Sequence, residues 1–188
     1  MNRPLRADAQ ANLDRLLEVA AAAFAREGAD TSLKAIAAEA QVGIGTLYRR
    51  FPTREDLVEA VYRNENARLS AAAPDLLATL PPREALQAWM QHFVDYMLTK
   101  RGMSDALPTI LTARDGLRAS SRQSLEDAVR TLMNAGGDAG LLRTDIHPYD
   151  VLMSLGGITL IAGHEHQRDL ASRLIELLLD GLARDTAR

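Results

Sequence analysis

A cluster of hydrogen-bond donors occupies residues 46–50, comprising the hydroxyls of Thr46 and Tyr48 and the guanidinium groups of Arg49 and Arg50. Hydroxyls and guanidinium groups donate hydrogen bonds to phosphate oxygens, and a guanidinium also pairs with the acceptor edge of guanine. Leu47 and Phe51 lie one helical turn apart, so a helix that buries this pair leaves the donors on or near its exposed side. The spacing therefore predicts a short helix that presents polar side chains to a nucleic acid.

A second short helix directly before this one is needed to hold it in place. Apolar residues recur at helical spacing in this stretch, at Leu33, Ile36, Ala37 and Ala40. Ser32 precedes them as an N-cap, whose hydroxyl accepts from backbone N–H groups that have no partner within the helix. Gln41 to Gly43 then turns the chain. The pattern predicts a helix-turn-helix over about residues 33–51, with its second helix in the position of a recognition helix.

The stretch Val42-Gly-Ile-Gly-Thr-Leu-Tyr-Arg-Arg-Phe-Pro-Thr-Arg-Glu-Asp-Leu57, with the amphipathic helix before it, resembles the tetracycline-repressor (TetR) family. The resemblance covers about residues 9–69 and implies a DNA-binding domain, with Tyr48 and Arg54 as phosphate contacts. The chain departs from the family at Gln41, where Gly is frequent. It departs also at Gly43 and Ile44, where Ser or Lys/Pro is usual, so the operator sequence does not carry over.

Two glycines at the start of the second helix have two interpretations each. Without a Cβ, Gly43 and Gly45 would let backbone N–H groups approach a phosphate closely. Alternatively, Gly43 only completes the turn; the two interpretations are balanced for Gly43, and close approach is favoured for Gly45. Ile44 is apolar and suits contact with a thymine methyl group. The predicted DNA-binding set is Ser32, Gly43, Ile44, Gly45, Thr46, Tyr48, Arg49, Arg50 and Arg54.

Charge is distributed unevenly although the formal net charge is only −3. Residues 1–70 hold ten Lys/Arg and ten Asp/Glu, whereas residues 71–188 hold twelve and fifteen. Residues 41–54 contain three arginines and no acid. The positive potential is thus focused on the predicted recognition segment, which suits a modest number of phosphate contacts in each subunit.

Composition excludes several classes of protein. The chain has no cysteine, which excludes disulfides and thiolate metal sites and fits a reducing cytoplasm. No apolar run approaches the length of a membrane span, and the N-terminus lacks the apolar core of a signal peptide. His164-Glu165-His166 lacks the spacing of a zinc site and is interpreted as a connector. We expect a cytoplasmic protein with no metal, no cofactor, no catalytic residues and no membrane partner.

The whole chain is expected to be all-α, because Ala and Leu are abundant and strand-like alternation is absent. The predicted domains are a DNA-binding domain at 9–69 and an effector-binding and dimerisation domain at 70–188. The prolines at 74, 81 and 82 suggest the boundary. The first helix is expected to end at Gly28, and Thr53 with Asp56 to form a capping box. Helices are also expected before Gly136-Gly137, from Pro148, and from about 169 to 183.

Residues 151–162 form an almost continuous apolar segment, typical of a helix that is buried on all sides or shared between chains. With the last helix it is predicted to form a four-helix seam across a two-fold axis, because the resembled family dimerises this way. An intrachain core helix is the alternative. The predicted dimer residues are Leu152, Leu155, Gly156, Gly157, Thr159, Leu174, Leu177 and Leu178.

A stripe of methionine and aromatic residues suits an adaptable apolar ligand pocket, although such a stripe is more often plain core. The candidate pocket residues are Trp89, Phe93, Tyr96, Met97, Met103 and Met133. The resemblance implies a dimeric repressor that a small-molecule effector releases from a palindromic DNA operator. The alternatives are a dimeric DNA-binding protein without small-molecule control, and a helical enzyme or adaptor that retains a helix-turn-helix.

Overall fold

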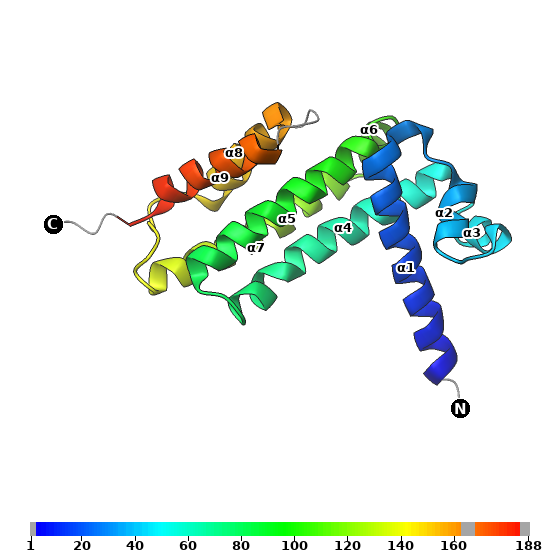
Figure 1. Ribbon diagram of the computed structural model, residues 1–188, viewed down its shortest axis with the longest axis horizontal. Helices are drawn as coiled ribbons and strands as arrows, with labels where there is room; N and C mark the ends of the chain where they lie inside the picture. The colour runs from blue at the N-terminus through cyan, green and yellow to red at the C-terminus, as the bar shows by residue number, and fades with distance from the viewer. Residues whose placement is uncertain (1–2, 163–167, 185–188) are drawn as a thin grey trace. The chain divides into compact units, whose positions relative to one another are not determined.

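The computed structural model describes residues 3–162 and 168–184, and in these ranges the chain forms helices and no named strand (Figure 1). The elements are α1 (Arg3–Glu27), the 3-10 helix η1 (Gly28–Asp30), α2 (Leu33–Glu39), α3 (Ile44–Arg50), α4 (Arg54–Leu77), α5 (Pro82–Gly102), α6 (Leu107–Ala113), α7 (Leu117–Asp138), α8 (Pro148–Ala162) and α9 (Arg168–Leu182). The all-α prediction is confirmed. No helix in the described ranges is both long enough and apolar enough to cross a bilayer.

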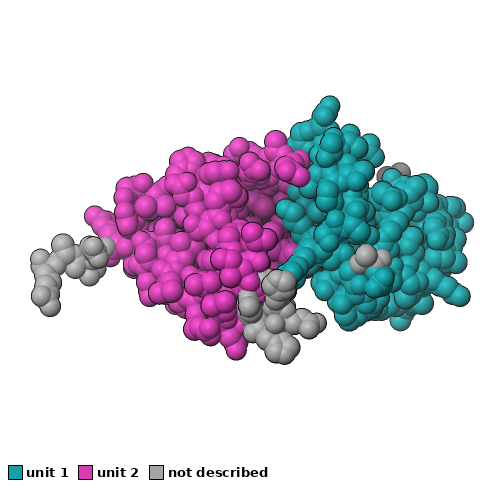
Figure 2. Space-filling view, turned by 90° about the horizontal axis from the view of Figure 1, so that it is seen from above, with its two compact units in different colours: residues 1–65, 98–117 teal, residues 66–97, 118–188 magenta. Residues whose placement is uncertain are grey.

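The chain divides into two compact units that do not follow chain order (Figure 2). Unit 1 contains residues 1–65 and 98–117, and unit 2 contains residues 66–97 and 118–188. Helices α4 and α5 each contribute to both units, so a segment from the middle of the chain belongs with the N-terminal helices. The predicted domain boundary at 69/70 falls inside α4.

Unit 1 has its core beneath the two short helices. Helix α1 packs one face on this core, with Leu16, Ala20 and Phe24 shielded from solvent. It ends at Glu27, and Gly28 follows with a φ of +61°. This left-handed conformation disfavours a side chain, so the predicted helix end at Gly28 is confirmed.

The helix-turn-helix forms where the sequence predicts it. The Ser32 hydroxyl accepts a hydrogen bond from the Ala35 N–H at 3.4 Å, as an N-cap does. At the end of α2 the chain reverses through Gln41, which has a φ of +57°. Glycine adopts this conformation more readily, which explains why the resembled family often has glycine here. Leu47 and Phe51 are buried and anchor α3 on the unit.

Helix α4 begins with the expected capping box and continues through Pro74, one of the prolines that suggested the domain boundary. The Thr53 N–H donates to the Asp56 carboxylate at 3.0 Å, and the Asp56 N–H donates to the Thr53 hydroxyl at 3.1 Å. The helix ends at Leu77. Pro74 is exposed and lies in the last turn, where the hydrogen bond that proline removes is close to the fraying end and costs least.

Unit 2 has an aromatic core on α5. Trp89 is fully buried, and its indole N–H donates to the Leu69 carbonyl of α4 at 2.8 Å. Asn66 of α4 is also buried; its amide donates to the Ser121 carbonyl of α7 at 3.1 Å and accepts from the Ser124 hydroxyl at 2.8 Å. The buried polar groups that join α4, α5 and α7 therefore have partners inside the unit, as stability requires.

Helix α7 passes through the two glycines that were expected to end it. It continues to Asp138, and Gly140, with a φ of +71°, follows in the left-handed conformation. A Cβ on Gly136 would lie 2.3 Å from the Leu142 side chain, which is buried. Gly136 is thus needed for close packing of the returning chain, and the turn lies four residues later than predicted.

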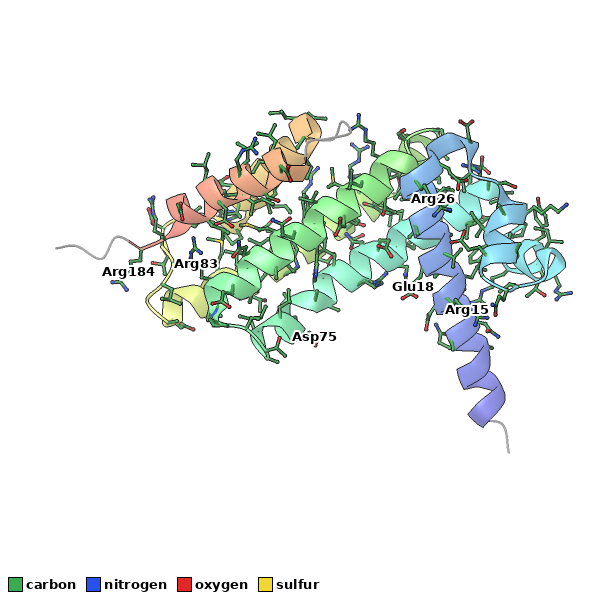
Figure 3. All side chains as sticks on the ribbon, in the orientation of Figure 1. Arg15, Glu18, Arg26, Asp75, Arg83 and Arg184 are labelled. Atoms are coloured by element: carbon green, nitrogen blue, oxygen red, sulfur yellow. The ribbon has the colours of Figure 1, made fainter. Side chains whose placement is uncertain are left out.

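Helices α8 and α9 lie side by side and run in opposite directions within unit 2 (Figure 1). Pro148 opens α8 as expected. Helix α9 contacts α5 through an ion pair between Arg83, labelled in Figure 3, and Asp180 at 2.9 Å. A hydrogen bond from Gln87 to Glu176 adds a second contact between the same helices. Helices α8 and α9 are therefore connected to α5 of unit 2 through α9.

Candidate nucleic-acid interface

Helix α3 turns one face to the core and the other to solvent. Leu47 is fully buried, whereas Ile44 is 40% and Tyr48 49% exposed, an unusual exposure for large apolar or aromatic side chains. Thr46, Arg49 and Arg50 are exposed as well. The structure thus brings the predicted donors together on one accessible surface, and the burial of Leu47 and Phe51 explains why this face points outward.

Two of the donors on this surface contact each other. The Arg49 guanidinium donates to the Thr46 hydroxyl at 2.8 Å, one turn back along α3. Three arginines, at 49, 50 and 54, belong to this segment, and the two on α3 lie in its last turn. Guanidinium groups with exposed donors can make bidentate contacts with phosphates or guanine.

The two glycines at the start of α3 are not required by the fold. Gly43 is the N-cap, with a φ of −62° that any residue adopts, and a Cβ there would make only ordinary contact with Thr46 at 3.8 Å. A Cβ on Gly45 would meet nothing within 4 Å. The space that the missing side chains leave therefore faces outward from the protomer.

Two other residues of the predicted set lie beside α3. Ser32 is exposed at the start of α2, and its hydroxyl caps that helix. Arg54 is different, because only 24% of its side chain is exposed and its guanidinium donates to the Thr31 carbonyl at 2.7 Å. It also lies 3.7 Å from the Asp105 carboxylate. Of the nine predicted residues, Arg54 has the most extensive contacts within the chain.

Carboxylates near the start of α4 are stabilised in their charged forms. Hydrogen bonds from the Thr53 hydroxyl and backbone lower the pKa of Asp56 below its ordinary value. Partial burial alone would raise the pKa of Glu59, but hydrogen bonds from Arg63 and Arg114 outweigh it and lower that pKa. These two arginines are therefore partly neutralised by Glu59.

The predicted pocket residues are mostly core. Trp89, Phe93, Tyr96, Met103 and Met133 are all buried, while Met97 is half-buried. The rings of Trp89 and Phe93 lie 5.9 Å apart, and those of Phe93 and Tyr96 lie 6.0 Å apart. Met103 belongs to unit 1 and the other five to unit 2. Within unit 2, these tilted ring contacts and the hydrogen-bonded Trp89 indole form a stabilising core.

The predicted dimer residues separate into two groups. Leu152, Leu155 and Thr159 are buried inside the protomer, so they leave little surface for a second chain to cover. The exposed or half-buried members are Gly156, Gly157, Leu174, Leu177 and Leu178. All eight residues were predicted to lie in the dimer seam, with an intrachain core helix as the alternative, because an almost uniformly apolar helix does not indicate which side faces the core.

The predicted dimer set omitted three exposed apolar residues of α8, which are Met153, Leu160 and Ile161. Leu160 is 78% exposed, Leu177 67% and Ile161 63%, and Met153 is also exposed. A Cβ on Gly156 or Gly157 would meet nothing within 4 Å. The charged residues of α9 indicate which of its sides is polar, but α8 carries charge only at Asp150. His164-Glu165-His166, interpreted above as a connector, lies outside the described residues.

Comparison with known proteins decides the family. Residues 16–61 match the profile described as bacterial regulatory proteins, tetR family. Residues 81–184, more than half of the chain, match the profile described as transcriptional regulator SbtR-like, C-terminal domain. The chain belongs to the TetR family of bacterial transcriptional regulators. The resemblance inferred from residues 42–57 is therefore confirmed, and members of this family are in general DNA-binding regulators rather than enzymes.

Solved TetR-family structures agree with this assignment. A TetR transcriptional regulator from Streptomyces coelicolor shares 47% identity over 92% of this chain and 99% of its own, with a TM-score of 0.86. One from Mycobacterium vanbaalenii shares 33% identity over 96% and 99%, with a TM-score of 0.77. A TetR-family regulator from Thermus thermophilus shares the fold, at 20% identity over 93% and 100% and a TM-score of 0.61. A search of curated proteins gave no significant match.

Proposed function

We propose that this TetR-family regulator is a dimeric repressor that binds a palindromic operator through α3. The observation that carries the proposal is the two-sided character of α3, where buried Leu47 fixes a helix whose Thr46, Tyr48, Arg49 and Arg50 remain accessible. Such a helix fits the major groove with its N-terminal residues against base edges. The DNA-binding domain comprises residues 9–69.

Individual residues of this surface have distinct roles in the proposal. Tyr48 and Thr46 donate to phosphates, and Arg49 and Arg50 reach phosphates or guanine. Ile44 at the start of α3 contacts a thymine methyl group. Gly43 and Gly45 let the backbone N–H groups of the first turn approach a phosphate, which the open space around Gly45 supports. Ser32 adds a contact from the start of α2.

The exposed apolar surface of α8 and α9 is the proposed dimer interface. Leu160, Ile161 and Leu177 are mostly exposed, and large apolar side chains gathered in this way are characteristic of surfaces that another protein covers. A second copy related by a two-fold axis would place α8 and α9 against their counterparts. Half-buried Leu174 and Leu178 and open Gly156 and Gly157 extend this surface. Dimerisation would place two α3 helices about one helical turn of DNA apart, or somewhat more.

Release by a small-molecule effector completes the proposal. Effector binding in the segment from residue 70 to 188 would change the separation of the two α3 helices and lower operator affinity, a coupling between two sites. Membership of the TetR family supports release by an effector. The second candidate function is a dimeric DNA-binding protein without an effector, and full burial of Trp89 with its indole hydrogen-bonded to Leu69 favours it.

Selection of bound duplexes from a random DNA library tests the proposal. The purified full chain, at moderate salt, is expected to recover a palindromic motif whose half-site spacing reports the dimer geometry. Recovery of unrelated, salt-sensitive sequences would contradict sequence-specific binding. Repeating the selection after unfolding and refolding removes a co-purified effector as the cause of such a failure. Native mass spectrometry before and after refolding then distinguishes the two candidate functions, because only an effector-controlled repressor releases a bound small molecule.

A further inference from the structure

The contacts of Arg54 point inward, toward the protein backbone. Its Nη1 donates to the Thr31 carbonyl at 2.7 Å, and its Nη2 donates to the Gly28 carbonyl at 3.4 Å. Its Nε lies 3.7 Å from the Asp105 carboxylate, and its Cζ lies 5.3 Å from the centre of the Phe24 ring. Four groups from three segments of unit 1, which are α1, the turn after it and the chain after α5, thus surround one guanidinium.

The two carbonyls belong to the turn that leads from α1 into α2. Gly28 begins the 3-10 helix after α1, and buried Thr31 precedes the Ser32 cap of α2. The Thr31 hydroxyl reinforces the turn by donating to the Gly28 carbonyl at 2.7 Å. Arg54 therefore binds the backbone at the point where the direction of α2 is set.

A second arginine holds the other end of α2. Arg15, midway along α1 and labelled in Figure 3, donates from Nε to the Ala40 carbonyl at 3.0 Å. Ala40 is the last residue before the turn into α3. Both ends of α2 are thus held through backbone carbonyls by arginines from the neighbouring long helices α1 and α4.

The Asp105 side of this cluster depends on an unusually close backbone contact. A Cβ on Gly102, at the end of α5, would lie 1.9 Å from the Phe24 carbonyl oxygen. Glycine at this position lets the chain after α5 pack directly on α1, and Asp105 follows three residues later. The Phe24 ring then lies against the guanidinium, a favourable arrangement for a cation and an aromatic face.

We propose that Arg54 is a positioning residue that fixes α2, and through it α3, for operator binding, and that it makes no phosphate contact. The inference rests on the proposed DNA-binding function. A lysine has one compact ammonium group and cannot reproduce the planar fork that serves two carbonyls and lies against Phe24. In this chain, charge alone would therefore not replace the contacts of Arg54.

Operator affinity as a function of salt concentration tests the proposal, using the selected duplex well below the melting temperature of each variant. Arg54→Lys keeps the charge but loses the fork, so we expect affinity to fall roughly tenfold with an unchanged salt slope. Arg63→Lys, on the exposed part of the same helix, is the matched control and should leave affinity unchanged. Unchanged affinity of Arg54→Lys would overturn the proposal, whether or not its melting temperature falls.

The Asp105→Asn substitution should change operator affinity in opposite directions for the two possible roles of Arg54. As a positioning residue Arg54 loses one anchor, and affinity should fall about threefold. As a phosphate contact it would lose a competing anion, and affinity would rise.

A further decisive result is the salt slope of Arg54→Ala, which should equal that of the wild type. A decrease of about two for the dimer, the loss of one phosphate contact per head, would overturn the inference. Failure of the wild type to bind any duplex would instead refute the proposed function itself, and this inference with it.

Discussion

Helix α3 and the α8–α9 pair both leave large side chains exposed, but the chemistry of the two surfaces is different. On α3 the exposed side chains include hydroxyls and guanidinium groups around Ile44 and Tyr48. On α8 and α9 the large exposed side chains include the aliphatic residues Leu160, Leu177 and Ile161, beside charged residues on the polar side of α9. Polar side chains remain well hydrated when exposed, whereas burial of the aliphatic side chains against a partner is favourable. The difference supports the two proposed partners, DNA for α3 and a second copy of the chain for α8 and α9.

The glycines of α3 and α8 also differ from glycines in the interior of the chain. Gly45 on α3 and Gly157 on α8 have open space where a Cβ would stand. Gly102 and Gly136, in contrast, would place a Cβ within 2.3 Å of other atoms of the same chain. The reason for the second pair lies inside the fold. For the first pair, the proposed reason is the approach of a partner molecule.

The largest expected effect comes from the buried side of α3. Leu47→Ala should lower the free energy of unfolding by about 2–5 kcal/mol, because Leu47 is fully buried and its truncation leaves a cavity. DNA binding should be lost through unfolding of the helix-turn-helix. Chemical denaturation followed by circular dichroism measures the change. An unaltered unfolding midpoint would show that Leu47 does not anchor α3.

The apolar surface is tested by placing a charge on it. Leu177→Glu should weaken dimerisation roughly 100-fold or more while the helical content stays unchanged, since an unpaired buried charge costs several kcal/mol. Leu141→Glu is the matched control, because Leu141 is an exposed leucine outside α8 and α9. Analytical ultracentrifugation gives both constants. A Leu177→Glu chain that dimerises as tightly as the control would place the interface elsewhere.

Two glycine substitutions test whether a glycine is needed for packing inside the chain or for contact with DNA. Gly102→Ala should lower stability by roughly 1–3 kcal/mol, because the Cβ overlaps the Phe24 carbonyl. Gly45→Ala should raise helix stability by a few tenths to about 1 kcal/mol and still weaken DNA binding. Thermal melts and operator titrations of both variants measure these effects. Full operator affinity in Gly45→Ala would remove the argument for close approach of the backbone.

A smaller effect is expected from the Tyr48 hydroxyl. Tyr48→Phe should leave the melting temperature unchanged, because the side chain is half exposed. Affinity should fall about threefold to tenfold per head for every duplex tested, as loss of one hydrogen bond to a phosphate implies. Fluorescence anisotropy with specific and unrelated duplexes gives the ratio. A loss confined to the specific duplex would make Tyr48 a base-reading residue instead.

The smallest effect concerns the capping box of α4. Because hydrogen bonds from Thr53 lower the pKa of Asp56 below 3.8, the stabilisation that they provide is complete above that pH. It is lost as the pH falls through the lower folded value. Asp56→Asn should therefore reduce stability near neutral pH and flatten the acid limb, whereas Glu55→Gln should retain the wild-type profile. Urea denaturation between pH 2 and about 7 compares the three chains. If the stability of Asp56→Asn changed with pH in the same way as that of the wild type, a charged Asp56 would not contribute to the cap.

Local patterns predicted the N-terminal elements well. The Ser32 cap, the turn at Gly28, the Thr53–Asp56 capping box and the buried Leu47 all depend on residues a few positions apart, so spacing in the sequence is sufficient to predict them. Long-range packing was not accessible in the same way. The close approach of Gly102 to Phe24 depends on a contact between residues far apart in the sequence.

Two features of the candidate surfaces depend on contacts that the sequence does not show. On α8 the sequence is apolar on all sides, so it does not reveal that Leu152 is buried while Leu160 is exposed. At Arg54, the family resemblance predicts a phosphate contact, whereas in the structure the guanidinium contacts the carbonyls of residues 28 and 31 and lies near Asp105. Residue type indicates which partners are possible, and only the fold shows which of them lie within reach.

The most direct test of the account is operator binding by the Arg49→Ala/Arg50→Ala double variant. Both side chains are exposed on α3, and the Arg49 guanidinium bonds to the exposed Thr46 hydroxyl, so folding should be intact. We predict wild-type melting and dimerisation, with affinity for the selected palindrome reduced at least about 100-fold by the loss of two charged contacts in each head. A correctly folded double variant that binds the palindrome as tightly as the wild type would contradict the assignment of α3 as the DNA-binding surface.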